Sequence, residues 1–524
     1  MTKTAVHPPS SQPMEEQHRP STAGTTMAAG NVLLRVDVLL LPIMTVAYGL
    51  QFYDKAVLGS ATIFGILTDL DLQVGKDLSR YSLATAAFYY GYIVGVIPAA
   101  LLSQRLKVTG FLGASIILWG AICLLTPAIT SWRGLVVQRV FLGLVESTVS
   151  PGFLLVTRQW YTSQEMPMRI GIWYSATGFF SVLSGLINYG LGTSTHSIPI
   201  WKTLFLVPGS LTVFFGIALL LLLPPSPTER PLLKIPGYNV FSEQEVELIL
   251  EKTRDEMLSR EQSKWNWSQV VEALLDVKVW IFTFMATAIY VVNGGVTAFG
   301  PIIIRSIGYT PTKAILLQTP GGAVTVVAIL VVAFVSLRFK NARLILLCLG
   351  SLPVLIGAAM IWGSSWSNKA VPLVGYWLLP AFGAPYVMLL SLVGANVAGS
   401  TKSAYASGAV FVGYNAGNIA AAYILKPTEA ARHYPTTWAI ITAMMLVTMA
   451  LAGLLAGIMA WENRKRDREG HTTKSQIEQL GGMAEDPVGR AQDDLASEES
   501  LKMHIELDQK DLTDKQNRAF RYVF

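Results

Sequence analysis

Charged residues are scarce in this chain. Asp, Glu, Lys and Arg make up 14 % of its 524 residues, against ~25 % in ordinary soluble domains. Hydrophobic residues make up 52 %, and the mean hydropathy is +0.45. This composition excludes an ordinary soluble globular protein and predicts a polytopic membrane protein.

The chain also lacks the patterns of several functional classes. Its two cysteines, Cys123 and Cys348, both lie in apolar runs, so no disulfide framework is predicted. Dinucleotide-binding, zinc-ligand and catalytic-triad patterns are missing from the loops, so we expect no enzyme, cofactor or metal site. The net charge of +6 is spread over loops and tails, which argues against a nucleic-acid partner.

Long apolar runs dominate the sequence instead. A helix needs ~20 such residues to cross a bilayer. Twelve segments meet this length, at about 38–58, 82–102, 110–129, 135–156, 170–192, 204–223, 278–300, 313–336, 343–363, 371–395, 403–425 and 436–461. We therefore predict an all-α polytopic membrane protein with 12 transmembrane helices in two six-helix halves.

The polar stretches divide the chain into five parts. They are a disordered cytoplasmic tail (1–34), an N-terminal half (35–224), a cytoplasmic central loop (225–276), a C-terminal half (277–461) and a solvated cytoplasmic tail (462–524). No basic region followed by an apolar run begins the chain, so residues 1–30 do not resemble a cleaved signal peptide. Within the central loop, Phe241–Leu258 predicts an amphipathic helix, with Ser242 as N-cap and Glu245 completing a capping box.

An internal repeat supports the two halves. The pattern Ser-x-Arg-x-Lys occurs at Ser103–Lys107, between spans 2 and 3, and again at Ser336–Lys340, between spans 8 and 9. Parallel duplicated halves with a substrate site at their interface are a known transporter architecture. The positive-inside bias is modest, but the basic cluster Arg464–Arg468 after the last span favours both termini in the cytoplasm.

The fourth span contains two ionisable residues. Arg139 and Glu146 are seven residues apart, so they lie on nearly one face of the helix, and Gly143 between them leaves room for another helix or a ligand. Charges at bilayer depth are kept mainly for function. The alternative is a structural Arg–Glu pair that joins two helices. Pro151 is expected to weaken the helix, because proline removes an i→i−4 hydrogen bond.

The first span adds Asp54 and Lys55. Counting helix rise along both spans places Asp54 and Arg139 in the outer half and Glu146 about 10 Å deeper. Two cations and two carboxylates are therefore expected in one cavity of the N-terminal half. The alternative for Asp54 and Lys55 is a snorkelling pair at the outer helix end.

Polar groups of the C-terminal half are expected to complete the cavity. The candidates are Asn293 in span 7 and Tyr414, Asn415 and Asn418 in span 11. The alternative role of Asn415 and Asn418 is hydrogen bonding between closely packed helices, next to Gly413 and Gly417. Tyr89 and Tyr90 in span 2 are lesser candidates, and Gly91 and Gly95 indicate close helix packing.

Four stretches carry a family resemblance: Leu50–Ile66, Gln138–Tyr161, Arg169–Gly178 and Asn396–Ala404. With the twelve spans they resemble the major facilitator superfamily and, within it, the fungal allantoate permease family of anion:cation symporters, over about residues 35–460. The resemblance implies proton-driven uptake of small organic anions. It also implies that Lys55 and Arg139 bind the anion and that Asp54 and Glu146 take up protons.

Two departures from the family pattern stand out. The loop Ser103–Gly110 lacks the acidic residue and glycine-rich ending of the superfamily motif, and Lys55 stands where many relatives have arginine. A lysine ammonium is a point charge, whereas an arginine guanidinium can donate two parallel hydrogen bonds to one carboxylate. Lys55 can therefore hold the anion differently.

The resemblance thus implies a proton-coupled symporter of a small carboxylate such as allantoate, nicotinate, pantothenate or a small peptide. We expect it to be a monomer in the plasma membrane. One alternative is a proton-antiport exporter of a drug or secondary metabolite. Such exporters usually carry a Gly-Pro-x-x-Gly-Gly element in span 5, and the glycines of this span stand without that proline. A minor alternative is a nutrient sensor that does not transport.

Overall fold

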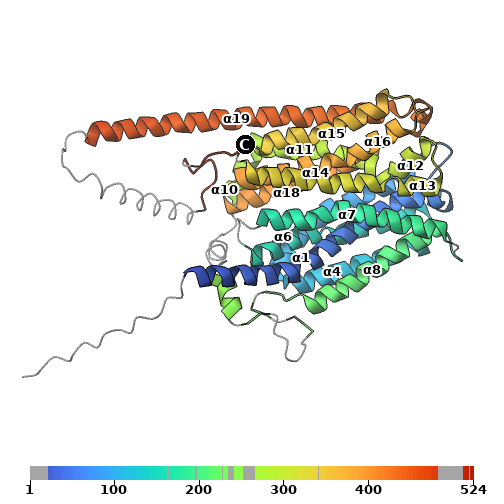
Figure 1. Cartoon of the computed structure of the whole chain (residues 1–524), viewed down its shortest axis with the longest axis horizontal. Helices are drawn as coiled ribbons and strands as arrows, with labels where there is room; N and C mark the ends of the chain where they lie inside the picture. Colours follow the sequence, from blue (N-terminus) through green and yellow to red (C-terminus); the bar gives the residue numbers. More distant parts are fainter. Residues whose placement is uncertain are drawn as a thin grey trace, which may run out of the picture.

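The computed structural model is a bundle of long helices (Figure 1). It describes residues 22–161, 166–194, 197–226, 228–229, 231–233, 241–242, 244–251, 266–339, 341–481, 511–518 and 520–524. Within these ranges no strand is present beyond an isolated bridge between Val74 and Asp77. Residues 1–21, expected to be disordered, and 482–510 lie outside the described residues.

The first half contains seven main helices. They are α1 (Thr22–Ala61), α3 (Ser79–Arg105), α4 (Val108–Leu124), α5 (Trp132–Glu146), α6 (Val149–Trp160), α7 (Met166–Thr193) and α8 (Ile200–Leu222), with short turns η1 (Thr62–Phe64), α2 (Ile66–Asp69) and η2 (Thr126–Ala128) between them. The first helix begins at Thr22, well before the span expected from about residue 38. Residues 22–34 are therefore helical, which corrects the expectation of a disordered tail over 1–34 for this part.

The second half follows a short helix of the central loop, α10 (Trp267–Leu274). Its elements are α11 (Val277–Asn293), η3 (Gly294–Ala298), α12 (Gly300–Ser306), α13 (Pro311–Leu316), α14 (Thr319–Arg338), α15 (Arg343–Gly363), α16 (Ala370–Leu378), η4 (Leu379–Phe382), α17 (Gly383–Asn396), α18 (Ser400–Ala421), η5 (Pro427–Arg432) and α19 (Pro435–Gly481). The last helix runs 20 residues past the expected end of the span at 461.

Ten helical stretches of the described chain are long and apolar enough to cross a membrane. Helices α3 and α18, with 27 and 22 residues, have the length but are not among the ten. Both pack inside the same bundle, α3 against α5 and α18 against α11. With these two, the described helices provide the twelve spans and the all-α fold that the sequence predicts.

Spans 4 and 10 are both interrupted. The fourth span changes from α5 to α6 at Ser147–Thr148. This is where Pro151 is expected to act, because its ring clashes with the carbonyl of residue i−4, which is Ser147. Side chains satisfy the carbonyls next to the break: Thr148 Oγ1 donates to Val145 O at 2.8 Å, and Gln51 Nε2 donates to Glu146 O at 3.3 Å. In the tenth span, η4 separates α16 from α17.

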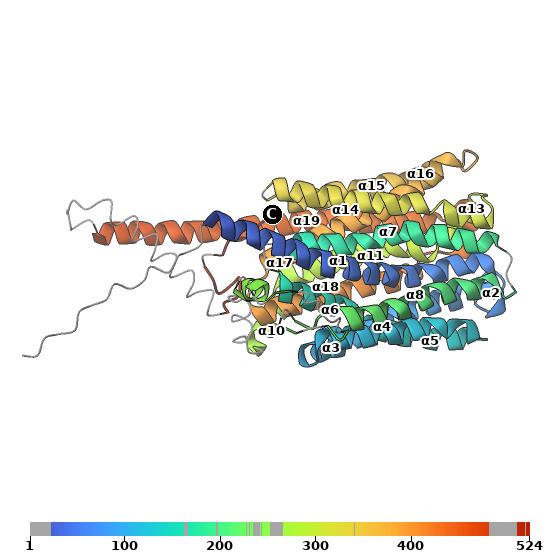
Figure 2. The same ribbon diagram turned by 60° about the horizontal axis from the view of Figure 1, so that its bottom comes forward.

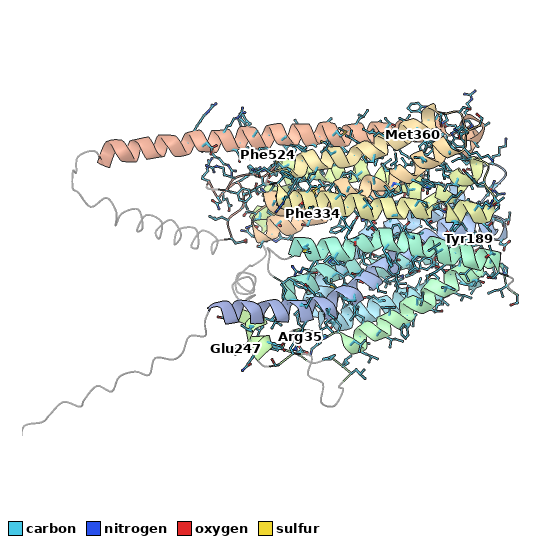
Figure 3. All side chains as sticks on the ribbon, in the orientation of Figure 1. Arg35, Tyr189, Glu247, Phe334, Met360 and Phe524 are labelled. Carbon is cyan, nitrogen blue, oxygen red and sulfur yellow. The ribbon has the colours of Figure 1, made fainter. Side chains whose placement is uncertain are left out.

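The bundle has two distinct ends (Figure 2). Helix α1 begins and α19 extends outward at one end, which we call the terminus end; the opposite one is the far end. In Figure 3, Arg35 of α1 marks the terminus end and Tyr189 of α7 the far end. The halves meet where α7 packs on α14 and α13, and where α3 packs on α18.

The central loop contains the predicted capping box. Ser242 N donates to Glu245 Oε2 at 2.8 Å, and Glu245 N donates back to Ser242 Oγ at 3.3 Å. The helix follows over residues 244–251, and the rest of the predicted helix, 252–258, lies outside the described residues. Arg35 Nη1 of α1 contacts Glu245 Oε1 at 2.7 Å, which ties this helix to the first half.

Residues 511–524 correct the expectation of a solvated tail. They pack on the terminus end of the second half, and Thr513, Asp514 and Tyr522 are buried there. The expectation failed because it judged the tail by its hydropathy alone. Its charged and aromatic side chains are instead stabilised by ion pairs and hydrogen bonds with the bundle.

Candidate functional site

A small cavity lies between the two halves. Helices α1 and α3 form its wall on one side, and α11, η3 and α18 form the other. The lining residues are Lys55, Leu58, Gly59, Tyr81, Thr85, Tyr89, Asn293, Thr297, Ala298 and Asn418. With a volume of ≈ 30 Å³, the cavity holds a few water molecules at most. A larger solute enters only if the halves move apart.

Lys55 is the cation in the cavity wall. Its Nζ lies 3.3 Å from Glu146 Oε2 on α5, and the Glu146 side chain is 0 % exposed. Within the described chain neither Glu146 oxygen accepts a hydrogen bond, so Lys55 is the partner that neutralises this carboxylate. The ammonium also lies over the rings of Phe88 and Tyr92, at 5.1 and 5.8 Å from their centroids.

This pairing differs from both alternatives drawn from the sequence. Among the described residues no ion pair joins Arg139 to Glu146, although both lie on one side of α5, and Gly143 between them packs on the backbone of α3 at Phe88. Asp54 and Lys55 do not form a snorkelling pair either. Consecutive side chains of a helix point ~100° apart. The side chains of Asp54 and Lys55 therefore lie in different surroundings.

Asp54 lies in the packed interior of the first half. Its Oδ2 accepts hydrogen bonds from Trp119 Nε1 of α4 at 2.5 Å and from Thr212 Oγ1 of α8 at 3.4 Å, and Cys123 Sγ lies 3.6 Å from Oδ1. The residue is 1 % exposed. Asp54 therefore connects α1, α4 and α8 and is absent from the cavity wall.

Arg139 is buried behind the cavity wall. Its guanidinium carbon lies 6.0 Å from the centroid of the Phe205 ring, and Nε and Nη2 have no hydrogen-bond partner within the described chain. It interacts electrostatically with both Asp54 and Glu146. The structure thus gathers the four predicted charges in the first half, but it exposes only Lys55 to the cavity.

The second half contributes an amide pair. Asn293 Nδ2 donates to Asn418 Oδ1 at 2.7 Å, and Thr297 Oγ1 donates to Asn293 Oδ1 at 2.6 Å. Both asparagines line the cavity, and for Asn418 the two predicted roles, cavity lining and interhelical bonding, coincide. Asn415 is buried away from the cavity and donates to Phe411 O of its own helix at 2.7 Å.

A layer of six tyrosines lies on the terminus side of the cavity. Tyr48, on α1, precedes Lys55 by two helical turns. The hydroxyls of Tyr174 and Tyr290 are 2.7 Å apart and join the two halves, and the ring centroid of Tyr290 lies 4.1 Å from that of Tyr414. The layer consists of Tyr48, Tyr92 and Tyr174 from the first half and Tyr290, Tyr386 and Tyr414 from the second.

Sequence reasoning singled out only Tyr414 from this layer. The layer cannot be recognised in the sequence, because its six tyrosines are far apart in the chain. Only the assembled bundle brings them together, one from each of α1, α3, α7, α11, α17 and α18. On the far side of the cavity, Tyr81 Oη donates to Ala298 O at 2.6 Å and connects α3 to η3. The sequence offered no reason to select Tyr81.

Comparisons with known proteins agree with this architecture. The sequence model of the Major Facilitator Superfamily matches residues 44–422. An uncharacterized transporter of Schizosaccharomyces pombe is 31 % identical over 499 residues, covering 95 % of this chain and 88 % of its own. The allantoate permease of Saccharomyces cerevisiae is 28 % identical over 503 residues, covering 93 % and 85 %.

Among solved structures, the proton:xylose symporter XylE has a TM-score of 0.61 at 15 % identity, covering 80 % of this chain and 95 % of its own. That likeness concerns the fold alone. The family match spans most of the chain and includes both halves. This chain therefore belongs to the Major Facilitator Superfamily and is a multi-pass membrane transporter rather than an enzyme.

Proposed function

We propose that this transporter takes up a small organic anion together with protons. The observation that supports the proposal most directly is the ion pair of Lys55 and Glu146, with the lysine in the cavity wall and the carboxylate fully buried behind it. Lys55 is the one charged side chain among the residues that line the cavity, and a cation there favours an anionic solute. The similarity to allantoate permease supports the same class of substrate.

The pair gives a physical route to coupling. A substrate carboxylate that binds Lys55 competes with Glu146 for the same ammonium. A buried carboxylate without a counter-charge is costly, so Glu146 then takes up a proton. Substrate and proton are loaded together, and releasing the substrate restores the Lys55–Glu146 pair and expels the proton.

The other candidates have supporting roles in this proposal. Arg139 supplies positive charge behind the site and balances Asp54 and Glu146. Asp54 is a second protonation candidate whose hydrogen bonds to α4 and α8 also hold the first half together. Asn293 and Asn418 offer amide donors and acceptors to the polar groups of the substrate.

We further propose that the protein acts as a monomer in the plasma membrane, with the terminus end in the cytoplasm. The candidate substrates are allantoate, nicotinate, pantothenate and small peptides. The tyrosine layer then separates the cavity from the cytoplasm, and the Tyr81–Ala298 contact separates it from the outside. Alternating access requires these two closures to open in turn.

Uptake measurements test the proposal. Cells that express this chain are given a panel of labelled organic anions, with and without a protonophore. We expect one or more anions to accumulate in acidic medium and the protonophore to abolish the accumulation. If expressing cells lose a preloaded compound faster than control cells and take up no anion, the antiport alternative replaces the symport proposal.

A further inference from the structure

Residues 511–524, which we call the 511–524 segment, lie across the terminus end of the second half. They contact α10, the starts of α11, α15 and α18, the end of α17, and α19. In Figure 3, Phe524 lies beside this end of the bundle. None of these residues lines the cavity, so the segment forms a second site that the transport proposal does not use.

Asp514 is the centre of the contact. Its carboxylate accepts hydrogen bonds from Lys402 Nζ at 2.6 Å, Lys278 Nζ at 2.8 Å and Tyr522 Oη at 2.7 Å. The side chains of Asp514 and Lys402 are 0 % exposed, and that of Lys278 is 1 % exposed. Charge-assisted bonds of this kind, shielded from water, are among the strong polar contacts in proteins. Two lysines from two helices thus recognise one acidic side chain.

The two ends of the segment are also recognised. Asp511 accepts from Ser400 N at 2.7 Å and from Gln269 Nε2 at 3.1 Å. At the other end, Asn396 binds the backbone of Val523 on both sides: its Oδ1 accepts from Val523 N at 2.7 Å, and its Nδ2 donates to Val523 O at 2.9 Å. Such paired amide–backbone bonds hold a bound peptide in one register.

An aromatic residue fills the space between these ends. Tyr522 is buried against Lys278, whose Nζ lies 3.6 Å from the centroid of the Tyr522 ring, and Arg466 Nη2 donates to its hydroxyl at 3.0 Å. Arg466 Nη1 also donates to Phe520 O at 2.6 Å. The site therefore binds an acidic residue, Asp514, and an aromatic residue eight positions later, Tyr522.

The receiving site can exist without the segment. Its cations are Lys278, Lys402 and Arg466, and they are matched by carboxylates of the bundle itself: Glu272, Asp276 and Glu462. The segment brings two acidic side chains, Asp511 and Asp514, and three basic ones. Of these basic side chains, Lys515 lies 3.7 Å from Asp276 Oδ2, Arg518 pairs with Glu469, and Arg521 pairs with Asp467. Because its own carboxylates match its cations, the receiving site has no excess charge before the segment docks.

We infer that the 511–524 segment is a tethered peptide ligand of the second half, and that transport requires it to be docked. The docked segment connects the terminus ends of spans 7, 9, 10, 11 and 12. Through Thr513, whose Oγ1 donates to Glu272 at 3.0 Å, it also fixes α10 of the central loop to this half. With the segment docked, the second half moves as one body against the first.

A binding measurement tests the site without any transported substrate. The protein lacking residues 511–524 is purified in detergent and titrated with a fluorescent peptide of those residues. We expect saturable binding, at least ten-fold weaker for the peptide with Asp514→Asn, because a buried charge pair is broken. The matched control is Lys515→Gln, which removes a charge at the neighbouring, partly exposed position and should change affinity less than three-fold. Equal affinities of the Asp514→Asn and unchanged peptides, or no binding, would overturn the inference.

A second experiment tests the requirement for transport and avoids a failure to fold. A protease recognition sequence is inserted between residues 482 and 510 of the full chain with Asp514→Asn, and the chain is cut after it has reached the membrane. We expect uptake of the anion found in the panel to fall several-fold after cutting and washing. Added peptide with the unchanged sequence should restore it. Unchanged uptake after the cut segment has been washed away would refute the requirement. The peptide-binding result does not depend on the anion proposal.

Discussion

The ammonium of Lys55 lies 3.3 Å from the carboxylate of Glu146, and this contact joins the cavity wall to the interior of the first half. One residue earlier, Asp54 is bound by Trp119 and Thr212 and takes no part in the cavity. Adjacent charges of one helix therefore lie in different surroundings. Lys55 can meet a solute, whereas Asp54 holds helices together, and the predictions below separate these roles.

Lys55→Gln should weaken substrate binding. A charge-assisted hydrogen bond contributes about 1.5–3 kcal/mol, which corresponds to a roughly ten- to hundred-fold loss of affinity. Affinity is measured by binding of labelled anion to purified protein, with surface expression as a check on folding. Lys55→Arg keeps the positive charge and is the matched control. This variant should still bind the labelled anion. Wild-type affinity in Lys55→Gln would mean that the lysine is purely structural.

Glu146→Gln should uncouple transport from protons. The amide imitates the protonated acid and leaves Lys55 free for the substrate, so binding and exchange should persist while uphill accumulation and its dependence on external pH are lost. The measurement compares proton-driven accumulation with substrate counterflow in the same vesicles. If the variant still concentrates substrate along a pH gradient as the wild type does, Glu146 serves only as a structural partner.

Arg139→Gln should destabilise the first half, and Asp54→Asn should rescue part of the loss. Without Arg139, two buried carboxylates face a single nearby lysine, and an uncompensated buried charge is strongly unfavourable. Removing one carboxylate as well restores the balance, with a coupling free energy of about 0.5–3 kcal/mol. Thermal unfolding of the two single variants and the double variant in detergent measures it. Strictly additive effects would show that the two residues do not interact.

Gly143→Ala should prevent α5 from packing on α3. A Cβ at Gly143 would overlap the carbonyl oxygen of Phe88, and one at Gly91 would overlap that of Val140, so backbone would have to move at the contact. We expect strongly reduced expression and a lower unfolding temperature. Gly171→Ala on α7 is the matched control, because nothing lies within 4 Å of its added Cβ. Normal expression of Gly143→Ala would mean that the helices can separate at little cost.

The docked 511–524 segment should withstand mild acid. Burial alone would raise the pKa of Asp514, but Lys278 and Lys402 outweigh it, so the pKa lies below its usual value. A lowered carboxyl pKa stabilises the docked state at pH above the unfolded pKa of ~3.9. That stabilisation is lost only as the pH falls through the lower, docked value. Protease protection of the segment should therefore be the same at pH 8 and pH 5, and release at pH 5 would contradict this.

Local features of the bundle could be predicted from the sequence because each depends on neighbouring residues. Apolar runs of sufficient length specify transmembrane helices. In the bilayer core the backbone N–H and C=O groups have no water to bond to, and a helix pairs them with one another. Pro151 predicts the break after Glu146, and the pair Ser242 and Glu245 predicts its capping box, which the structure confirms. Gly143 marks a close helix approach, which the structure places against Phe88 of α3.

The sequence by itself determined the class of protein, the number of spans and the set of buried charges. Only the tertiary structure decided which charges meet. Glu146 pairs with Lys55, Asp54 turns toward α4 and α8, and Asn418 rather than Asn415 reaches the cavity. The docking of Asp514 on Lys278, 236 residues away in the chain, is equally invisible in the sequence. The physical reason is the same in each case: periodicity gives the face of a helix that a side chain occupies, but the packing of the other helices sets what that face contacts.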